Sequence, residues 1–460
     1  MNTTLNDNKK QYNTILAIAG PVFLEQVMVT LVQYVDTAMV GSLGATATAS
    51  IAINTSSIDL VNGIMMAIGI GITALMARAF GSGEKETAQK YTRQVLSLSL
   101  VIGIITTILM CVLSPHIPVW LGAADDILDN AKAYLTIISA AYLFRTITIL
   151  FTAVYRSFGD TKTPLKINIL SNIINVIGNV ILIYPTRSIL FFGKELTIYG
   201  AGMGVAGAAL STSFATVVGA VITLLLVFNQ NSYLPLKLSD NFSFDKKLLG
   251  KIFKISLPTA LERGVMSTAL IVMTWLITQL GTLPLAAHHI ALTAEALFFM
   301  PGFAFSVAGT TLVGQAIGSK DTNLAFNLSQ KTLKISIFIM CFAGVALYFM
   351  DNFLVSLFSN DPYVLEKGAY CLRLYAIIQP IQVVSTAITG CLRGAGDTKT
   401  PFYILSCSMI SIRIIGSIIG VLVFGFNVEW VWQMICLDIV VRCVFFLIRF
   451  YKKSWLHTKI

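Results

Sequence analysis

Charged residues are scarce in this 460-residue chain: 12% are Asp, Glu, Lys or Arg, whereas 56% are hydrophobic. A soluble domain has about 25% charged and about 45–50% apolar residues. Apolar stretches recur along the chain, and about 20 such residues suffice for a helix to cross a hydrocarbon core of roughly 30 Å. The composition therefore excludes a water-soluble globular protein and predicts a multi-pass membrane protein.

Paired cysteines and a cleavable leader are also lacking. The seven cysteines lie singly in apolar segments without a C-x-x-C pair, so neither a disulfide framework nor a zinc site is indicated. Residues 1–12 carry no apolar core with a small-residue cleavage site, so we expect the first spanning helix to direct its own insertion. No G-x-S-x-G or H-E-x-x-H is present, and the adjacent His288 and His289 cannot ligate a metal from one helix face. We expect neither an enzyme nor a bound cofactor.

Basic residues exceed acidic ones, giving a net charge of +10. They form no single patch or arm of the kind that binds nucleic acid. Most of them fall in alternate loops, and the positive-inside rule then places both termini in the cytoplasm. We expect a protein of the cell (inner, plasma) membrane with lipid around it and no nucleic-acid partner. No motif indicates an oligomer, and we expect a monomer.

One unit of sequence occurs twice. Residues 156–164 (RSFGDTKTP) match residues 393–401 (RGAGDTKTP), an offset of 237 (393 − 156). The same offset pairs Glu25 with Glu262 and Gly81 with Gly318. Such self-similarity indicates that the halves are copies of one structural unit.

The repeat predicts an all-α membrane protein with about twelve transmembrane helices in two parallel six-helix repeats around a central cavity. Residues 1–238 form the N-terminal lobe (helices 1–6), and residues 239–460 form the C-terminal lobe (helices 7–12). The predicted spans are 13–38, 50–79, 94–114, 130–155, 165–186, 198–228, 250–279, 285–316, 333–352, 364–392, 402–424 and 428–450. Thr163 and Thr400 are predicted N-caps.

Ionisable side chains inside these spans cost about 2.5–3.5 kcal/mol each at a helix centre, so they indicate function unless a partner explains them. Asp36 and Glu25 lie on one face of the first helix. The fifth helix carries a polar stripe of four asparagines, which are Asn168, Asn172, Asn175 and Asn179. Either the stripe faces a hydrated cavity and supplies oxygens to a cation beside Asp36, or it makes hydrogen bonds between helices.

The repeat helps to distinguish these alternatives. A polar residue found in one half alone suits a functional site, whereas a residue found at the same place in both halves suits a structural role. Asp36 falls opposite Met273, so the coupling site is predicted in the first lobe. Glu25 and Glu262 are duplicated, and a structural role stays as open as a functional one.

The second half holds weaker candidates. Glu295 shares a helix face with His288, which could form a second, proton-responsive site. A pairing of Glu295 with a neighbouring Arg or Tyr is the other interpretation, and the one we favour. Asp438 and Arg442, four residues apart, are predicted to form an ion pair.

Over nearly the whole chain these features resemble the multidrug and toxic compound extrusion (MATE) family. The motifs are residues 33–41 (QYVDTAMVG), 204–212 (GVAGAALST) and 312–315 (LVGQ), together with the two loops at 156–164 and 393–401. Their order and spacing carry the resemblance. It implies an antiporter in which Na⁺ or H⁺ entry drives the export of amphipathic, often cationic molecules by alternating access.

The resemblance also implies functional residues. Asp36 and Asn175 match the ion-coupling pair, with Na⁺ as one candidate ion, and Thr212 and the backbone of Ala208 match further contributors. Pro21 matches a first-helix proline at which bending accompanies ion binding.

Three positions depart from the family pattern. Asn179 stands where many relatives have a second aspartate, which favours weaker Na⁺ binding and leaves H⁺ open. Met266 and Gln382 stand where other relatives carry acids, although Gln382 stays a secondary candidate. The alternative functions are a flippase for lipids or lipid-linked oligosaccharides, and a membrane-embedded enzyme.

Overall fold

The computed structural model describes the chain except residues 1–7, 192–193, 231–232, 238 and 459–460. Among the described residues, eleven helical segments are long and apolar enough to span a membrane, and a bent pair of helices gives a twelfth. The predicted helix number and the two-repeat arrangement are confirmed. The helices of the first half are α1 Asn8–Gly41, α2 Ala45–Gly81, α3 Lys85–Leu113, α4 Ile117–Trp120, α5 Asp125–Ala140, α6 Tyr142–Ser157, α7 Lys162–Leu182 and α8 Gly204–Phe228.

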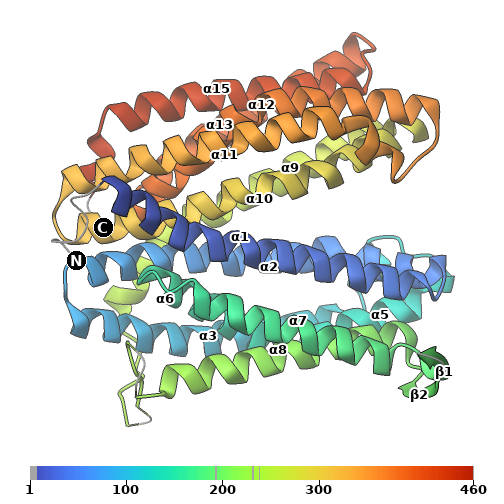
Figure 1. Cartoon of the computed structure of the whole chain (residues 1–460), viewed down its shortest axis with the longest axis horizontal. Coiled ribbons are helices and arrows are strands. Elements are labelled where there is room, and N and C mark those ends of the chain that lie inside the picture. Colours follow the sequence, from blue (N-terminus) through green and yellow to red (C-terminus); the bar gives the residue numbers. More distant parts are fainter. Residues whose placement is uncertain (1–7, 192–193, 231–232, 238, 459–460) are drawn as a thin grey trace.

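The second half repeats this order of spanning helices (Figure 1). Its elements are α9 Lys246–Thr278, α10 Thr282–Gly318, α11 Thr322–Ser356, α12 Pro362–Gly394, α13 Lys399–Ser408, the π-helical η1 Met409–Ile415, α14 Gly416–Ile418, the π-helical η2 Ile419–Val423, α15 Val428–Tyr451 and the 3₁₀ turn η3 Ser454–His457. The segments from α13 to η2 form one continuous span.

Two features of the first half differ from the predicted spans. The predicted helix 130–155 is broken between α5 and α6, whose axes differ by 52°. The residues between α7 and α8 form an antiparallel hairpin of β1 Pro185–Phe191 and β2 Lys194–Ala201, where helices were predicted to end at 186 and to start at 198. Pro185 explains the early end of α7, because the residue before a proline disfavours helical geometry.

The predicted caps of the repeated motif were wrong. The Asp160 carboxylate accepts hydrogen bonds from the backbone N–H groups of Lys162 and Thr163, at 3.2 and 2.9 Å. In the second copy Asp397 accepts from the N–H of Thr400 at 3.2 Å. The aspartate precedes the first helical turn and its oxygen reaches the free donors there, so it caps the helix in place of the threonine.

The first and seventh spans each connect the two halves. Ile15, Ile18 and Val22 of α1 pack in a core built mainly by α10, α11, α12 and α15. Ile252 and Ile255 of α9 pack in a core built mainly by α2, α3 and α6, with a smaller contribution from α8. The beginnings of α1 and α9 therefore lie against the opposite half, across the predicted lobe division.

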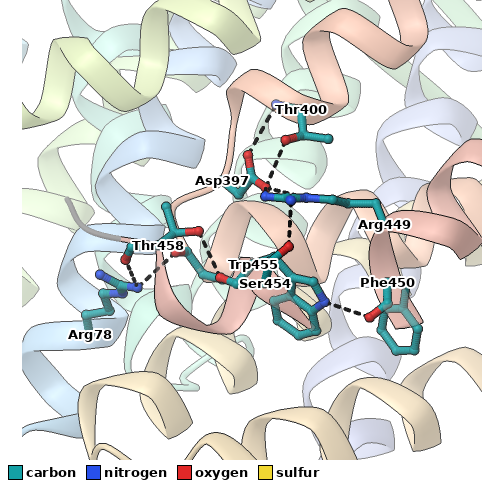
Figure 2. A network of polar contacts seen from close by, with 9 residues as sticks. Arg78, Asp397, Thr400, Arg449, Phe450, Ser454, Trp455 and Thr458 are labelled. Atoms are coloured by element: carbon teal, nitrogen blue, oxygen red, sulfur yellow. Dashed lines mark hydrogen bonds and ion pairs between the residues drawn. The ribbon is translucent and has the colours of Figure 1, made fainter. Parts of the chain in front are cut away.

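The halves meet closely at the end of the bundle that carries both termini, opposite the β1–β2 hairpin (Figure 1). A Cβ added at Gly81 would lie 1.9 Å from the Gln315 carbonyl oxygen, and one at Gly318 would lie 2.1 Å from that of Arg78. The Arg78 guanidinium donates to the carbonyl oxygens of Ala395 and Thr458, at 2.9 and 3.0 Å (Figure 2). Backbone contact and hydrogen bonds thus close this end.

Candidate functional site

A central cavity of about 1010 Å³ lies between the two halves. Helices α1, α2, α5, α6, α7 and α8 supply most of its wall, and α9, α10 and α12 complete it. Its polar lining includes Asp36, Asn175 and Thr212 in the first half and Arg263 and Arg393 in the second. The volume suits a drug-sized molecule, since such pockets measure roughly 300–1,000 Å³.

Four side chains from three helices form a hydrogen-bonded chain at one side of this cavity. The Asn179 amide donates to the Asp36 carboxylate at 2.5 Å and to Asn175 Oδ1 at 2.8 Å. Asn175 Nδ2 in turn donates to Thr212 Oγ1 at 3.0 Å. Asn179 is fully buried and Asn175 is 5% exposed. Sequence reasoning had singled out all four residues.

Small residues bring the helices of this group together. A Cβ at Gly178 would lie 2.4 Å from Ser211 Oγ, and one at Gly207 would lie 2.4 Å from the Leu182 carbonyl oxygen, so α7 and α8 approach closely. Ser211 Oγ donates to the Asn175 carbonyl oxygen at 2.7 Å. Tyr184 OH donates to the Met39 carbonyl oxygen at 3.0 Å, which anchors the end of α1 that carries Asp36.

The group contains one carboxylate. Among the described residues no cluster of three or more His, Cys, Asp or Glu could hold a metal ion. The Asp36 carboxylate accepts a hydrogen bond from the Asn179 amide nitrogen, while Asn179 Oδ1 is buried without a hydrogen-bond partner. Rotation of that amide would turn its oxygen toward the carboxylate, where it could face a cation. The donor set fits a proton on Asp36 or a weakly held Na⁺, which prefers oxygen ligands.

The other first-half candidates lie elsewhere on α1, α7 and α8. Asn168 accepts a hydrogen bond from Asn172 at 2.9 Å, and both side chains line the cavity. Ala208 is buried and also lines it. Pro21 lies within α1, which continues unbroken across it.

The duplicated glutamates each pair with a duplicated arginine. Arg156 lies 2.8 Å from Glu25, and Arg393 lies 2.8 Å from Glu262. All four side chains are largely buried, and the first pair and Arg393 line the cavity. Equivalent pairs in both halves agree with a structural role, and partners satisfy both charges.

In the second half Glu295 lies near Tyr375, whose buried hydroxyl has no hydrogen-bond partner among the described residues. The favoured pairing of Glu295 with a neighbouring Arg or Tyr therefore stays a prediction. His288 instead accepts a hydrogen bond from Trp432 Nε1 at 3.2 Å.

Asp438 forms ion pairs with Arg442, as predicted, and with Arg413 on η1, which was not predicted. These residues lie outside the lining of the central cavity.

Sequence reasoning missed residues whose role depends on the fold. The pairing of Arg156 with Glu25 could have been predicted from the sequence, because both residues recur 237 positions later as Arg393 and Glu262. Asp59, Arg145 and Tyr134 also line the cavity. Asp59 and Arg145 had been recognised as charged residues inside spans but were assigned no role, and Tyr134 carried no signal in the sequence.

The amino-acid sequence is similar to that of known membrane transporters. The sequence profile of the MatE family matches residues 21–181 and 258–419. A probable multidrug resistance protein NorM of Thermotoga maritima is 26% identical over 443 residues, which cover 96% of this chain and 92% of that protein. The multidrug resistance protein MdtK of Pectobacterium atrosepticum is 26% identical over 399 residues, covering 84% and 83% of the two chains.

Solved structures match over almost the full length. An outward-facing structure of a multidrug resistance MATE family transporter of the MOP superfamily superimposes with a TM-score of 0.88 at 20% identity. The match covers 98% of this chain and 97% of that chain. The two proteins therefore share one fold.

Proposed function

Because the chain belongs to the MatE family of multidrug efflux transporters, we propose that it exports amphipathic, often cationic small molecules in exchange for entering Na⁺ or H⁺. The observation that carries this proposal is the Asp36 carboxylate, which lines a drug-sized cavity and accepts a hydrogen bond from Asn179. An unneutralised acid in a membrane is costly, so such residues mark ion or substrate pathways.

Competition at this carboxylate supplies the coupling. Ionised Asp36 makes the first-half wall attractive to a positive charge, whether on a drug or on a coupling ion. When H⁺ or Na⁺ neutralises Asp36, the attraction for a cationic drug falls and the drug dissociates. A ligand shifts a conformational equilibrium only by its difference in affinity for the two states, so the coupling also requires the drug and the ion to bind the two states with different affinities.

Two arrangements of the halves complete the cycle. The contacts of Gly81 and Arg78 close the end that bears the termini in this conformation. Breaking them would expose the cavity at that end and commit the protein to the opposite state. We propose that both termini are cytoplasmic, so that this conformation faces outward, and that the protein acts as a monomer in the cell membrane without a cofactor.

The test is efflux from proteoliposomes with imposed Na⁺ and H⁺ gradients applied separately, with ethidium as the cationic probe. We expect at least one gradient to drive export in the wild type and neither to drive it in Asp36→Asn. The Asn side chain keeps the size of Asp but can neither bind a proton nor carry charge. The conservative control is Asp126→Asn at the exposed start of α5, which should transport normally. Gradient-driven export by Asp36→Asn at the wild-type rate would contradict the proposal.

A flippase for lipid-linked oligosaccharides would require a strongly basic cavity for a pyrophosphate. Here Glu25 and Glu262 neutralise two of the four cavity arginines. A labelled-lipid scrambling assay in the same liposomes separates the two functions, and we expect no acceleration of scrambling over protein-free vesicles.

A further inference from the structure

A second pocket lies in the second half, at the end of the bundle opposite the termini (Figure 1). Its volume is about 490 Å³, and residues of α11, α12 and α15 line it. Helix α12 packs against both α11 and α15. The second pocket shares no lining residue with the central cavity, so the proposed export cycle gives it no role.

The end of this pocket beside the first turns of α12 and α15 has more carboxylates than positive charges. Lys367 forms ion pairs with Glu366 at 2.9 Å and with Glu429 at 2.8 Å. One ammonium group thus serves two carboxylates. Glu429 Oε2 has no hydrogen-bond partner among the described residues, and the Glu366 side chain is 73% exposed. This part of the pocket can therefore accept a further positively charged donor.

An arginine lies further along the same face of α12. Arg373 follows Glu366 by seven residues, about 10 Å along the helix, and it also lines the pocket. The Asp351 carboxylate of α11 accepts a hydrogen bond from Arg373 Nε. The terminal amino groups of Arg373 make no hydrogen bond within the described part of the chain, and 48% of the side chain is exposed. A guanidinium with such a free edge can bind a phosphate through two parallel hydrogen bonds.

Exposed apolar side chains continue from the pocket toward the middle of the bundle. On α11 they form a stripe at spacings of four, three and four residues, made of Phe338, Phe342, Val345 and Phe349. Asn352 follows Phe349 by three residues, so it lies on the same helix face, and it lines the pocket. On α12 the exposed Ile377 follows Arg373 by four residues. A lipid whose acyl chains lie along this stripe would place its headgroup in the pocket.

We infer that the second pocket binds the headgroup of an aminophospholipid, which carries a primary amine and a phosphate, from the leaflet opposite the termini. The amine lies between Glu366 and Glu429, the phosphate lies at Arg373, and the acyl chains follow the apolar stripe of α11. Along α12 the order of acid, arginine and apolar side chain matches the order of amine, phosphate and chains in such a lipid. A simple organic cation would leave Arg373 unused, and the excess of carboxylates disfavours an anionic lipid.

The first experiment compares lipids on the wild-type protein. Phosphatidylethanolamine and phosphatidylcholine are matched probes, because they differ only by three methyl groups on the amine. Delipidated full-length protein is mixed with both in equal amounts, and the lipid retained is counted by native mass spectrometry. The methylated amine has no N–H to donate to a carboxylate, so we expect phosphatidylethanolamine to be retained about tenfold better. Equal retention of the two, or stronger retention of phosphatidylglycerol, which lacks the amine, would overturn the inference.

Variants then locate the retained lipid. Glu429→Gln removes one negative charge at the amine position, and Arg373→Lys keeps a positive charge beside Asp351 but loses the fork of donors. We expect each to reduce the preference for phosphatidylethanolamine about tenfold. Asp126→Asn and Lys132→Gln are the controls. Both lie on α5 at the same end of the bundle and outside the pocket, and both should keep the wild-type preference.

The ratio of the two lipids within one variant is independent of a general loss of folded protein. Loss of preference in both pocket variants supports the inference. An unchanged preference in both would place the lipid elsewhere and overturn it. A loss in Glu429→Gln alone would indicate a bound amine without its phosphate, and a loss in Arg373→Lys alone would indicate a bound anion; either result would overturn the assignment to an aminophospholipid. No ion gradient is applied, so the result is independent of the proposed export function.

Discussion

At the scale of single residues, the asparagines of α7 differ in their hydrogen-bond partners. Asn175 bonds Thr212 and Asn179, and Asn179 bonds Asp36, so loss of either leaves buried polar atoms unpaired. Among the residues that the structure describes, the Asn168 side chain bonds only Asn172 of its own helix. The stripe read from the sequence is therefore divided by the fold into a part beside the carboxylate and a part further along the cavity wall.

We expect Asn175→Ala and Asn179→Ala to weaken the dependence of efflux on the ion gradient about tenfold, and Asn168→Ala to change it less than twofold. An unpaired buried polar group costs about 1–3 kcal/mol, which is the source of the larger effect. The measurement is the ion concentration that gives half-maximal efflux in proteoliposomes. Equal shifts in all three variants would favour a packing role for the whole stripe.

A second carboxylate at position 179 should change the ion. Asn179 lies 2.5 Å from the Asp36 carboxylate, so in Asn179→Asp two acids would share one site. Like charges at this distance need a cation or a shared proton between them. We expect Na⁺ to stimulate efflux by Asn179→Asp at least tenfold more strongly than in the wild type. Asn172→Asp, on the same helix but not bonded to Asp36, is the control and should show no such gain.

Much of the first-half site could be predicted from sequence, because helical spacing fixes which residues share a face. Asp36 and the asparagines needed no tertiary information beyond the inward direction of that face. The partners of Glu25 and Glu262 needed the fold, since Arg156 and Arg393 come from other helices.

At the scale of elements, the length of the hydrophobic stretches predicted the membrane-spanning helices, but it did not predict where a helix is bent or broken. The bend between α5 and α6 falls at Ala141, which carries no helix-breaking side chain. Packing against α2, α3 and α8 sets the directions of α5 and α6, and these directions cannot be predicted from hydrophobic periodicity. The early end of α7, in contrast, could have been predicted from Pro185. The predicted span continued to residue 186 because the sequence around the proline is hydrophobic.

The crossing of α2 and α10 near their C-terminal ends depends on two equivalent glycines. A methyl group at Gly81 would meet the Gln315 carbonyl oxygen at 1.9 Å. We expect Gly81→Ala to disfavour the closed contact by about 1–3 kcal/mol, the usual effect of overpacking. The conformational equilibrium should then move about tenfold or more toward the state open at the end that bears the termini. Distances between spin labels on α2 and α10 measure this shift.

Gly20→Ala is the matched control for that variant. It adds the same methyl group to a helix at a position with no atom within 4 Å of the new Cβ. We expect its label distances to stay those of the wild type. Unchanged distances in Gly81→Ala as well would mean that the backbone contact does not hold the halves together.

At the scale of the whole molecule, the C-terminal tail takes part in the contact between the halves (Figure 2). Arg78 of the first half bonds the carbonyl oxygens of Ala395 and Thr458 in the second. Arg449 fixes the tail from its own side, binding Asp397 at 2.6 Å and Ser454 at 2.7 Å. Residues 452–458 thus take part in the closure, and the Asp397 that caps α13 also binds Arg449 beside them.

We expect Arg78→Gln to open this end more often, because hydrogen bonds to a charged group contribute about 1.5–3 kcal/mol. A shift of 1.4 kcal/mol is about tenfold in population. In a variant whose native cysteines are replaced, Ser306→Cys places a thiol in the cavity wall. A membrane-impermeant maleimide added on the side of the termini should label it about tenfold faster when Arg78 is replaced.

Truncation after Leu456 separates the contribution of the tail from that of α12. It removes the Thr458 acceptor but leaves Ala395, so labelling should rise by less than in Arg78→Gln. Lys452→Gln, which removes an exposed charge from the same tail, should leave the rate unchanged. Labelling as slow in Arg78→Gln as in the parent would mean that the glycine contacts alone keep the halves closed. If the labelling rate rises with the number of Arg78 hydrogen bonds that are lost, these bonds stabilise the state that is closed at the end bearing the termini.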